Sequence, residues 1–155
     1  DLVKIIEKSK KINYANKINP CTKTFQAIRI FVNKEITELI HGVINATKKL
    51  KPGGKIIVIS FHSLEDRIVK YFFTNFSKNQ SRPSRYLPEH QVSNATLFNE
   101  YKNKVLRPSN IEIKKNSRSR SAKLRFAIRS NTKFQYPSKM IKKFKKYLDL
   151  EAINV

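Results

Sequence analysis

Residues 50–70, with the sequence LKPGGKIIVISFHSLEDRIVK, constrain the fold more than any other stretch of this chain. Pro52, Gly53 and Gly54 form a breaker cluster that is typical of a tight turn. The apolar run over residues 55–61 is rich in β-branched side chains and predicts a strand covered on both faces, as in a parallel sheet. Such a strand needs neighbouring strands, so the sequence predicts an α/β fold.

The residues after this strand predict a polar corner that leads into a helix. Ser63 can cap the helix by accepting a hydrogen bond from the amide of Asp66. The first turn of a helix favours negative charge, which suits Glu65 and Asp66. Ser60, His62 and Ser63 then lie at the carboxyl end of the strand, where ligands gather in open α/β sheets. The corner is therefore the best candidate site, although capping alone explains Ser63 and Asp66, and a lone histidine is often structural.

Length and composition indicate one domain with its own core, because the chain has 155 residues of which 39% are hydrophobic. The single cysteine, Cys21, excludes an internal disulfide and fits a reducing compartment. No run approaches the roughly 18 apolar residues of a membrane-spanning helix, and no signal peptide is visible, so we expect a cytoplasmic protein. The chain starts within an apparent helix, so we expect a piece of a longer protein.

The charge predicts a polyanionic partner. Lys and Arg number 33 and Asp and Glu 11, which gives a net charge of +22. The excess is greater towards the end: residues 101–155 hold 16 basic and 3 acidic side chains, against 17 and 8 in residues 1–100. Dense Lys and Arg favour nucleic acid, because they neutralise phosphates. An A/T-rich genome, which inflates Lys and Asn everywhere, is the alternative, but it does not account for the arginines within 118–129.

Periodicity and breakers predict the remaining elements. Helical spacing of apolar residues favours four helices, over residues 2–9, 22–50, 66–76 and 137–150, of which the second would start at Thr22 or Thr24 and pack on a sheet. Residues 10–20 read as a polar connector and 77–103 as a long loop. A brief strand is expected at 104–107, a capping box with one or two helical turns from Ser109, and a half-exposed strand at 122–129.

Basic residues near that last strand form a second candidate site. Arginine forks match phosphate oxygens, which favours contact with RNA. A solvated face of an edge strand, where charges discourage aggregation, is the structural alternative. The site comprises Arg118, Arg120, Lys123, Arg125 and Arg129. The basic terminal helix could lie on an anionic membrane, although its apolar face more simply docks on the sheet.

Three segments resemble, in the correct order, the carboxyl half of the bacterial RsmH family, also called MraW. They are TKTFQAIRIFVN, LKPGGKIIVISFHSLEDRIVKYFF and RPSNIEIKKNSRSRSAKLRFAIR, of which the phrase FHSLEDRIVK is the most specific. The LKPGG turn alone is shared more widely among Rossmann-like methyltransferases. Members of the RsmH family use S-adenosylmethionine to methylate N4 of a cytidine in 16S ribosomal RNA.

The resemblance implies the carboxyl-terminal part of a Rossmann-like, S-adenosylmethionine-dependent methyltransferase sheet. Residues 1–20 would end an inserted helical substrate-recognition domain, 21–130 would be the carboxyl half of the methyltransferase domain, and 131–155 a basic helical extension. In the family the cofactor-binding loop and acidic motifs precede this region. None of the three glycines here opens a helix after a strand in the arrangement of such a loop. We therefore expect no cofactor-binding residue in this chain and no activity from it alone.

The resemblance also implies roles for individual residues. Methyl transfer to an exocyclic amine depends mainly on positioning the base, which polar groups at a strand end can do. His62 could bond the base or a phosphate, Ser60 and Ser63 could position it, and Asp66 could orient Arg67 or His62. The proposed catalytic residues are Ser60, His62, Ser63, Asp66, Arg67 and Asn33, and the proposed RNA-binding residues are Arg29, Arg118, Arg120, Lys123 and Arg125.

The implied partner is 16S rRNA or the small ribosomal subunit, with no membrane and no metal, and a homodimer is left open. A different class of function competes with this one. Charge alone would suit a small basic RNA-binding or ribosome-associated module that needs no chemistry. Binding of S-adenosylmethionine separates the two.

Overall fold

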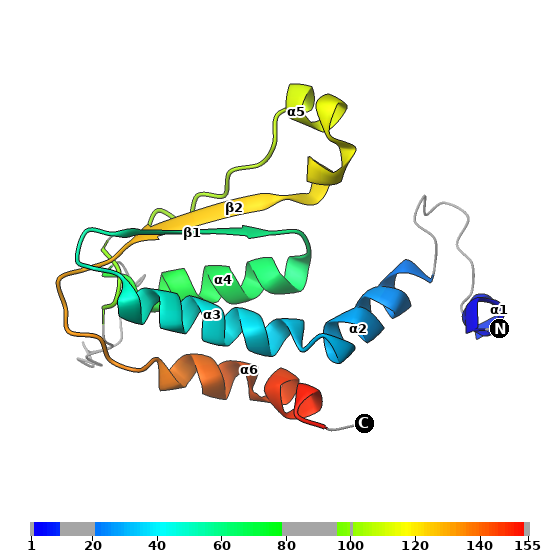
Figure 1. Ribbon diagram of the computed structural model, residues 1–155, viewed down its shortest axis with the longest axis horizontal. Helices are drawn as coiled ribbons and strands as arrows, with labels where there is room; N and C mark the ends of the chain where they lie inside the picture. The colour runs from blue at the N-terminus through cyan, green and yellow to red at the C-terminus, as the bar shows by residue number, and fades with distance from the viewer. Residues whose placement is uncertain (1, 10–20, 79–95, 100, 154–155) are drawn as a thin grey trace, which may run out of the picture. The chain divides into compact units, whose positions relative to one another are not determined.

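Figure 1 shows a computed structural model that describes residues 2–9, 21–78, 96–99 and 101–153. Composition led us to expect one domain, but the chain forms two compact units. The first comprises Asp1–Glu38 with Lys146–Val155, and the second Leu39–Lys145. The expected connector at 10–20 and most of the expected loop at 77–103 lie outside the described residues.

The first unit contains α1 (Leu2–Ser9), α2 (Thr22–Val32), the start of α3 (Glu35–Lys49) and the end of α6 (Ser138–Glu151). The structure confirms the helix expected at 2–9, whose buried side chain is Ile6. It also confirms a terminal helix near 137–150. α2 begins after Cys21, whose side chain makes no capping hydrogen bond, so neither threonine is its N-cap.

The single helix expected over residues 22–50 is wrong, because α2 and α3 are separate helices. Asn33 closes α2, and Lys34 adopts a left-handed backbone conformation with φ of 51°. The spacing of apolar residues could not predict this break, because it continues across it, through Phe25, Ile28, Ile36 and Ile40. Burial differs between the two helices: Ile36 and Ile40 of α3 are buried, but Phe25 and Ile28 of α2 are 46% and 43% exposed.

The second unit is built on two antiparallel strands, β1 (Lys55–Ser60) and β2 (Lys123–Ile128). Both strands lie where the sequence predicts them. Their register pairs Lys55 with Ile128 and Ser60 with Lys123, so β1 ends where β2 begins. The brief strand expected at 104–107 is reduced to one antiparallel bridge, in which Leu106 pairs with Leu124.

One face of the two strands packs against α4 (Ser63–Asn75), as Figure 1 shows. α4 starts three residues before the helix expected at 66–76. Its buried aromatic rings join those of the following segment, and Phe72 and Phe73 each contact Phe98 edge to face, with centroids 5.3 and 5.2 Å apart. Tyr71 makes a similar contact with Phe144 of α6 at 5.3 Å. These rings form an aromatic cluster in the core of this unit.

The prediction that β1 is covered on both faces is wrong for the described residues. Ile57 and Ile59 are 60% and 56% exposed, and Phe61, which follows on the same side, is 57% exposed. The register places Phe126, 41% exposed, beside Ile57 on this face. A two-stranded sheet with one layer of helix leaves its second face open, whatever the composition of that face.

A short excursion separates the Leu106 bridge from β2. It contains α5 (Asn110–Lys115) and η1 (Ser117–Ser121), a 3₁₀ helix that the sequence did not lead us to expect. Ser109 caps α5 by accepting a hydrogen bond from the amide of Glu112 at 3.2 Å, which confirms the predicted cap. In Figure 1 this excursion lies beyond the start of β2.

Within the described ranges, the structure contains no helix long and apolar enough to cross a membrane.

Candidate active site and RNA-contact residues

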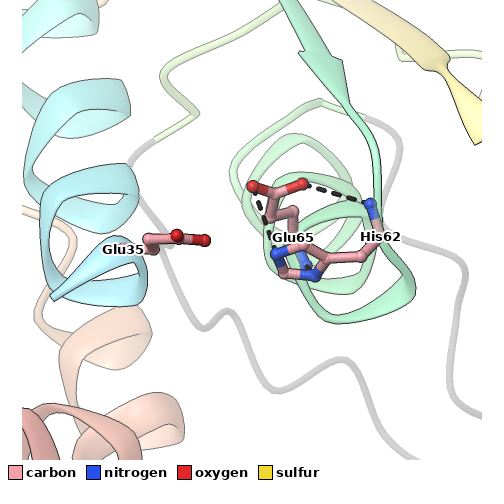
Figure 2. A group of neighbouring side chains, drawn as sticks. All are labelled: Glu35, His62 and Glu65. Carbon is pink, nitrogen blue, oxygen red and sulfur yellow. Dashed lines mark hydrogen bonds and ion pairs between the residues drawn. The ribbon is translucent and has the colours of Figure 1, made fainter. Parts of the chain in front are cut away.

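The corner after β1 is held by a reciprocal cap between His62 and Glu65, which Figure 2 shows. The Glu65 amide donates to Nδ1 of His62 at 3.3 Å. In return, Oε2 of Glu65 accepts from the amides of Phe61 and His62, at 2.9 and 3.2 Å. This arrangement satisfies backbone amides that the helix itself leaves without partners. Glu35, also drawn in Figure 2, belongs to the first unit.

The predicted cap residue is therefore wrong: His62, not Ser63, is the N-cap of α4. His62 has the extended backbone of a cap residue, with φ of −129° and ψ of 163°, while Ser63 is the first residue of the helix. Serine is the commoner cap, which is why the sequence favoured it. The spacing of His62 and Glu65, three residues apart, was the signal that could have identified the true pair.

The capping geometry also assigns the tautomer of a neutral imidazole at His62. Nδ1 of His62 accepts a hydrogen bond, so the proton of the neutral ring resides on Nε2. Nε2 lies 3.2 Å from Oε1 of Glu65, and the side chain of His62 is 9% exposed. The ring thus sits at the strand end in a defined orientation, with Glu65 beside both nitrogens.

Asp66 is held by two basic residues of β2 rather than by the corner. Oδ1 and Oδ2 of Asp66 accept from Nε and Nη2 of Arg125, at 2.7 and 3.2 Å, and Oδ2 also accepts from Nζ of Lys123 at 3.3 Å. Nη1 of Arg125 donates to Tyr101 at 2.9 Å and to Asn103 at 3.3 Å. The side chain of Asp66 binds neither Arg67 nor His62 in these contacts. The expected role of Asp66 in orienting one of those two residues is therefore not seen.

The ion pair shifts the pKa values of both partners. Partial burial of Asp66 opposes its ionisation, but the hydrogen bonds and charges of Arg125 and Lys123 outweigh it and lower the pKa of Asp66 below its ordinary 3.8. For Arg125 burial opposes the cation, while hydrogen bonds to Asp66 and Tyr101 raise its pKa. Both groups therefore remain charged across the neutral range, and α4 is tied to β2 by a charge pair.

Two arginines of the predicted strand at 122–129 are buried and do not face the solvent. Arg125 and, just beyond the strand, Arg129 are each only 5% exposed, whereas Phe126 between them is 41% exposed. Arg129 donates to the carbonyl oxygens of Leu97 and Thr132, both at 2.8 Å. The sequence showed that charged and apolar residues alternate. It did not show which set is buried, because the hydrogen-bond acceptors of the two arginines lie in α4 and in loops.

The other residues of the corner differ in exposure. Ser60 is 3% exposed, and its hydroxyl donates to the carbonyl of Lys123 at 3.4 Å. Ser63 and Arg67 are both exposed. Ser63, Arg67 and the exposed ring of Phe61 are therefore the side chains of the corner that a ligand can reach without rearrangement.

Two predicted residues lie in the first unit, around Glu35. Nε and Nη2 of Arg29 donate to the two carboxylate oxygens of Glu35 at 2.7 and 3.1 Å, and Asn33 donates to Oε1 at 3.3 Å. Arg29 is exposed, so this bidentate pair lies at the surface. Arg29 and Asn33 thus share one acceptor, in the turn between α2 and α3.

The side chains of Arg118 and Arg120, by contrast, are exposed on η1 and make no hydrogen bond or ion pair with any described residue. The sequence did not single out Glu65, Tyr101, Asn103 or Glu35 as partners at these sites. Only Glu65 had a local signal. The others reach their partners through the fold, from a loop or from beyond a helix break.

Comparison with known proteins connects these observations to a family. Residues 1–130 match the model of the MraW methylase family. The chain is 49% identical over 115 residues to the ribosomal RNA small subunit methyltransferase H of Bartonella grahamii, covering 74% of this chain and 34% of that protein. The proteins of the same name from Bartonella quintana and Caulobacter vibrioides are 48% and 41% identical, over 84% of this chain and 39% and 42% of their own lengths.

The chain therefore spans well under half the length of these relatives. The matched range includes the His62 corner, the Asp66–Arg125 pair and the exposed arginines of η1. With a family model covering all the predicted site residues and most of its length, the chain belongs to the MraW methylase family.

Proposed function

We propose that this chain is part of an S-adenosylmethionine-dependent enzyme that methylates N4 of a cytidine in 16S ribosomal RNA. The observation that carries the proposal is the identity of 41–49% to proteins named ribosomal RNA small subunit methyltransferase H, over the segment that holds the corner and η1. The substrate atom and the RNA species come from the family resemblance. The cytoplasm, where ribosomes are made in bacteria, is the corresponding location.

We place the base at the corner after β1. A cytosine whose N4 is methylated must be held with that nitrogen in line with the methyl group, so most of the rate enhancement comes from positioning. Ser63 and Arg67 offer a donor and a cation at the exposed side of the corner, and His62 offers a ring fixed by Glu65. We assign these three residues to substrate positioning. Ser60 and Asp66 support them, because the contacts of both lie within the sheet and helix.

We propose that the cofactor binds to the part of the relatives that this chain does not match. S-adenosylmethionine supplies the methyl group when bound, and we assign no residue of this chain to it. The 155-residue chain alone should therefore neither bind S-adenosylmethionine measurably nor methylate RNA. Calorimetric titration checks this, and micromolar binding by the isolated chain would contradict it.

The existing ion pairs favour two of the five proposed RNA-binding residues over the other three. Arg118 and Arg120 are exposed and unpaired among the described residues, so their guanidinium groups are available for phosphates. Arg125 and Lys123 bind Asp66, and Arg29 binds Glu35, so an RNA contact by these three would compete with an existing pair. We therefore propose Arg118 and Arg120 as the primary RNA contacts. Neither a homodimer nor a metal is needed for this account.

The direct test is methyl transfer by the natural protein that contains this sequence. Purified small ribosomal subunits or 16S rRNA are incubated with radiolabelled S-adenosylmethionine, and the RNA is digested to nucleosides. Label in N4-methylcytidine supports the proposal. The exposed cations of η1 favour one alternative, a module that binds RNA without chemistry, and tight RNA binding without any methyl transfer would select it.

A further inference from the structure

The segment between Leu106 and β2 forms a closed structure that we call the basic arm, residues 107–121. Its base is fixed at the sheet, because Leu106 and Leu124 exchange two backbone hydrogen bonds of 3.0 and 2.9 Å. α5 and η1 pack against each other within it. Figure 1 shows them beyond the start of β2. The arm is therefore anchored at both ends and presents its outer surface to solvent.

Short polar residues hold the arm in shape. Ser109 accepts from the amide of Glu112 at 3.2 Å, and Oδ1 of Asn116 accepts from the amide of Arg118 at 3.1 Å. Ser119, only 7% exposed, donates to the carbonyl of Asn116 at 2.8 Å. None of these bonds uses a cationic side chain, so the cations are not needed to maintain the fold of the arm. A preformed surface also loses less entropy when it binds.

The arm has five basic residues and one acid, Glu112, so its net charge is 5 − 1 = +4. All five basic side chains are exposed, and none forms an ion pair with a described residue. They are Arg107, Lys114, Lys115, Arg118 and Arg120. This separates them from Arg125 and Lys123, which both form ion pairs with Asp66.

The arm lies at the same end of the sheet as the candidate active site. The register pairs Ser60, the last residue of β1, with Lys123, the first residue of β2. Phe61 and His62 follow Ser60 directly, and η1 ends at Ser121, two residues before Lys123. The corner and the arm therefore leave the sheet together, although about 60 residues separate them along the chain.

We propose that the basic arm grips the phosphate backbone of the ribosomal RNA that flanks the target cytidine, while the His62 corner receives the base. The inference rests on the proposed function and adds the element that holds the substrate strand. RNA is favoured over an acidic protein surface because the exposed residues of the arm are cationic or small and polar, apart from the acid Glu112 and Ile111, which is 68% exposed. Charges spread over α5 and η1 suit successive phosphates, which position an RNA without reading its sequence.

The test uses the natural protein with 16S rRNA as the probe. The variants are Arg118→Ala with Arg120→Ala, and the same pair combined with Lys114→Ala and Lys115→Ala. The slope of log binding constant against log salt concentration should fall by up to about two for the double variant and about four for the quadruple one, roughly one per lost phosphate contact. KM for the RNA should rise about tenfold or more, with kcat within about twofold, because binding and not chemistry is lost.

The matched control removes the same charge elsewhere. Lys142→Ala with Lys143→Ala deletes two exposed cations of α6 and should leave the slope and KM nearly unchanged. An unchanged slope in the quadruple variant, or an equal change in the α6 control, would overturn the proposal. A loss of affinity for the whole ribosomal subunit on Ile111→Ser, with none in the quadruple variant, would overturn it in favour of a protein partner.

Failure of the arm and failure of the proposed function give different results. If the enzyme is not a methyltransferase of this RNA, the unaltered protein transfers no methyl group. If only the arm is misassigned, the unaltered protein methylates the RNA and the arm variants retain its KM.

Discussion

His62 combines a capping role, which the structure shows, with a proposed role at the substrate. Replacing His62 with alanine removes the acceptor for the Glu65 amide and should lower the free energy of unfolding by about 1 kcal/mol, as for other N-caps. In the natural enzyme we also expect a lower kcat with nearly unchanged affinity for S-adenosylmethionine. Thermal unfolding, calorimetry and turnover measured on one preparation check the three parts.

His62→Asn is the matched control for that variant. Asparagine is a good N-cap but offers no imidazole, so it should restore stability without restoring turnover. If His62→Asn is as active as the unaltered enzyme, His62 is a cap and nothing more. A parallel loss of cofactor affinity in His62→Ala would lead to the same conclusion.

Asp66 should matter for stability more than for chemistry. Asp66→Asn leaves Arg125, which is 5% exposed, without its anionic partner, and we expect the free energy of unfolding at neutral pH to fall by about 2–4 kcal/mol. Chemical denaturation measures this, with Glu112→Gln, which alters an exposed acid, as the control. A loss below about 0.5 kcal/mol in Asp66→Asn, within the range of ordinary surface changes, would mean that the pair contributes little.

The same pair predicts a pH dependence. Because the pKa of Asp66 is lowered in the folded state, its contribution is complete above the unfolded pKa of about 3.9 and is lost as the pH falls through the folded value. The unaltered protein should therefore lose stability more steeply below about pH 4 than Asp66→Asn does. Equal slopes for the two proteins below that pH would show that Asp66 is not the titrating group.

At the scale of elements, the sequence predicted best what depends on neighbours along the chain. β1, β2, α1 and the Ser109 cap follow from local composition, and the structure has all of them near the expected positions. The break between α2 and α3 depends on a left-handed Lys34, and no apolar repeat reveals that. The inward orientation of Arg125 depends on Asp66, 59 residues away. The sequence alone therefore could not predict contacts between residues that are far apart along the chain.

Glu151 shows how a distant residue completes an element of the first unit. Its carboxylate accepts from the amides of Ile36 and Thr37, at 3.2 and 2.8 Å, and it is only 4% exposed. It thereby supplies the start of α3 with the acceptors that a local cap would provide. Glu151 lies beyond the range matched by the family model, so the basic extension expected at 131–155 includes a residue that stabilises the matched part.

Glu151→Ala should accordingly weaken the start of α3. Two amides lose their acceptor, and we expect the free energy of local opening to fall by about 1–3 kcal/mol. Hydrogen exchange of the Ile36 and Thr37 amides measures this directly, and faster exchange at both is the expected result. Asp149→Ala, which alters an exposed acid of the same helix, should leave these rates unchanged. Equal protection in both variants would contradict the capping role.

At the scale of the whole molecule, the exposed face of β1 and β2 is unfavourable for an isolated chain, because it leaves large apolar side chains in contact with water. Fully burying a large apolar side chain is worth roughly 1.5–3 kcal/mol, so each half-exposed residue here leaves about 1 kcal/mol unrealised. The residues concerned are Ile57, Ile59, Phe61 and Phe126. Among the described residues β1 also pairs on one edge only, with β2. Such an edge beside an apolar face recruits other chains.

We therefore expect the isolated 155-residue chain to be oligomeric or poorly soluble despite its charge of +22. The relatives carry more than half of their length outside the matched region, and supplying that part as a separate chain should yield a soluble complex. Ile57→Lys with Ile59→Lys should abolish the complex, whereas Ile111→Lys, at another exposed isoleucine, should not. Sedimentation decides the matter, and a stable monomer at high concentration would contradict the expectation.

The most direct test of the central claim is the amount of N4-methylcytidine in 16S rRNA from cells that carry or lack the gene containing this sequence. Mass spectrometry of digested RNA should show this nucleoside at one site in the unaltered strain, its loss on deletion, and its return on complementation with the unaltered gene. Complementation with the Arg118→Ala, Arg120→Ala variant should return less of it. Unchanged N4-methylcytidine after deletion, or loss of a methyl group from another atom, would contradict the account.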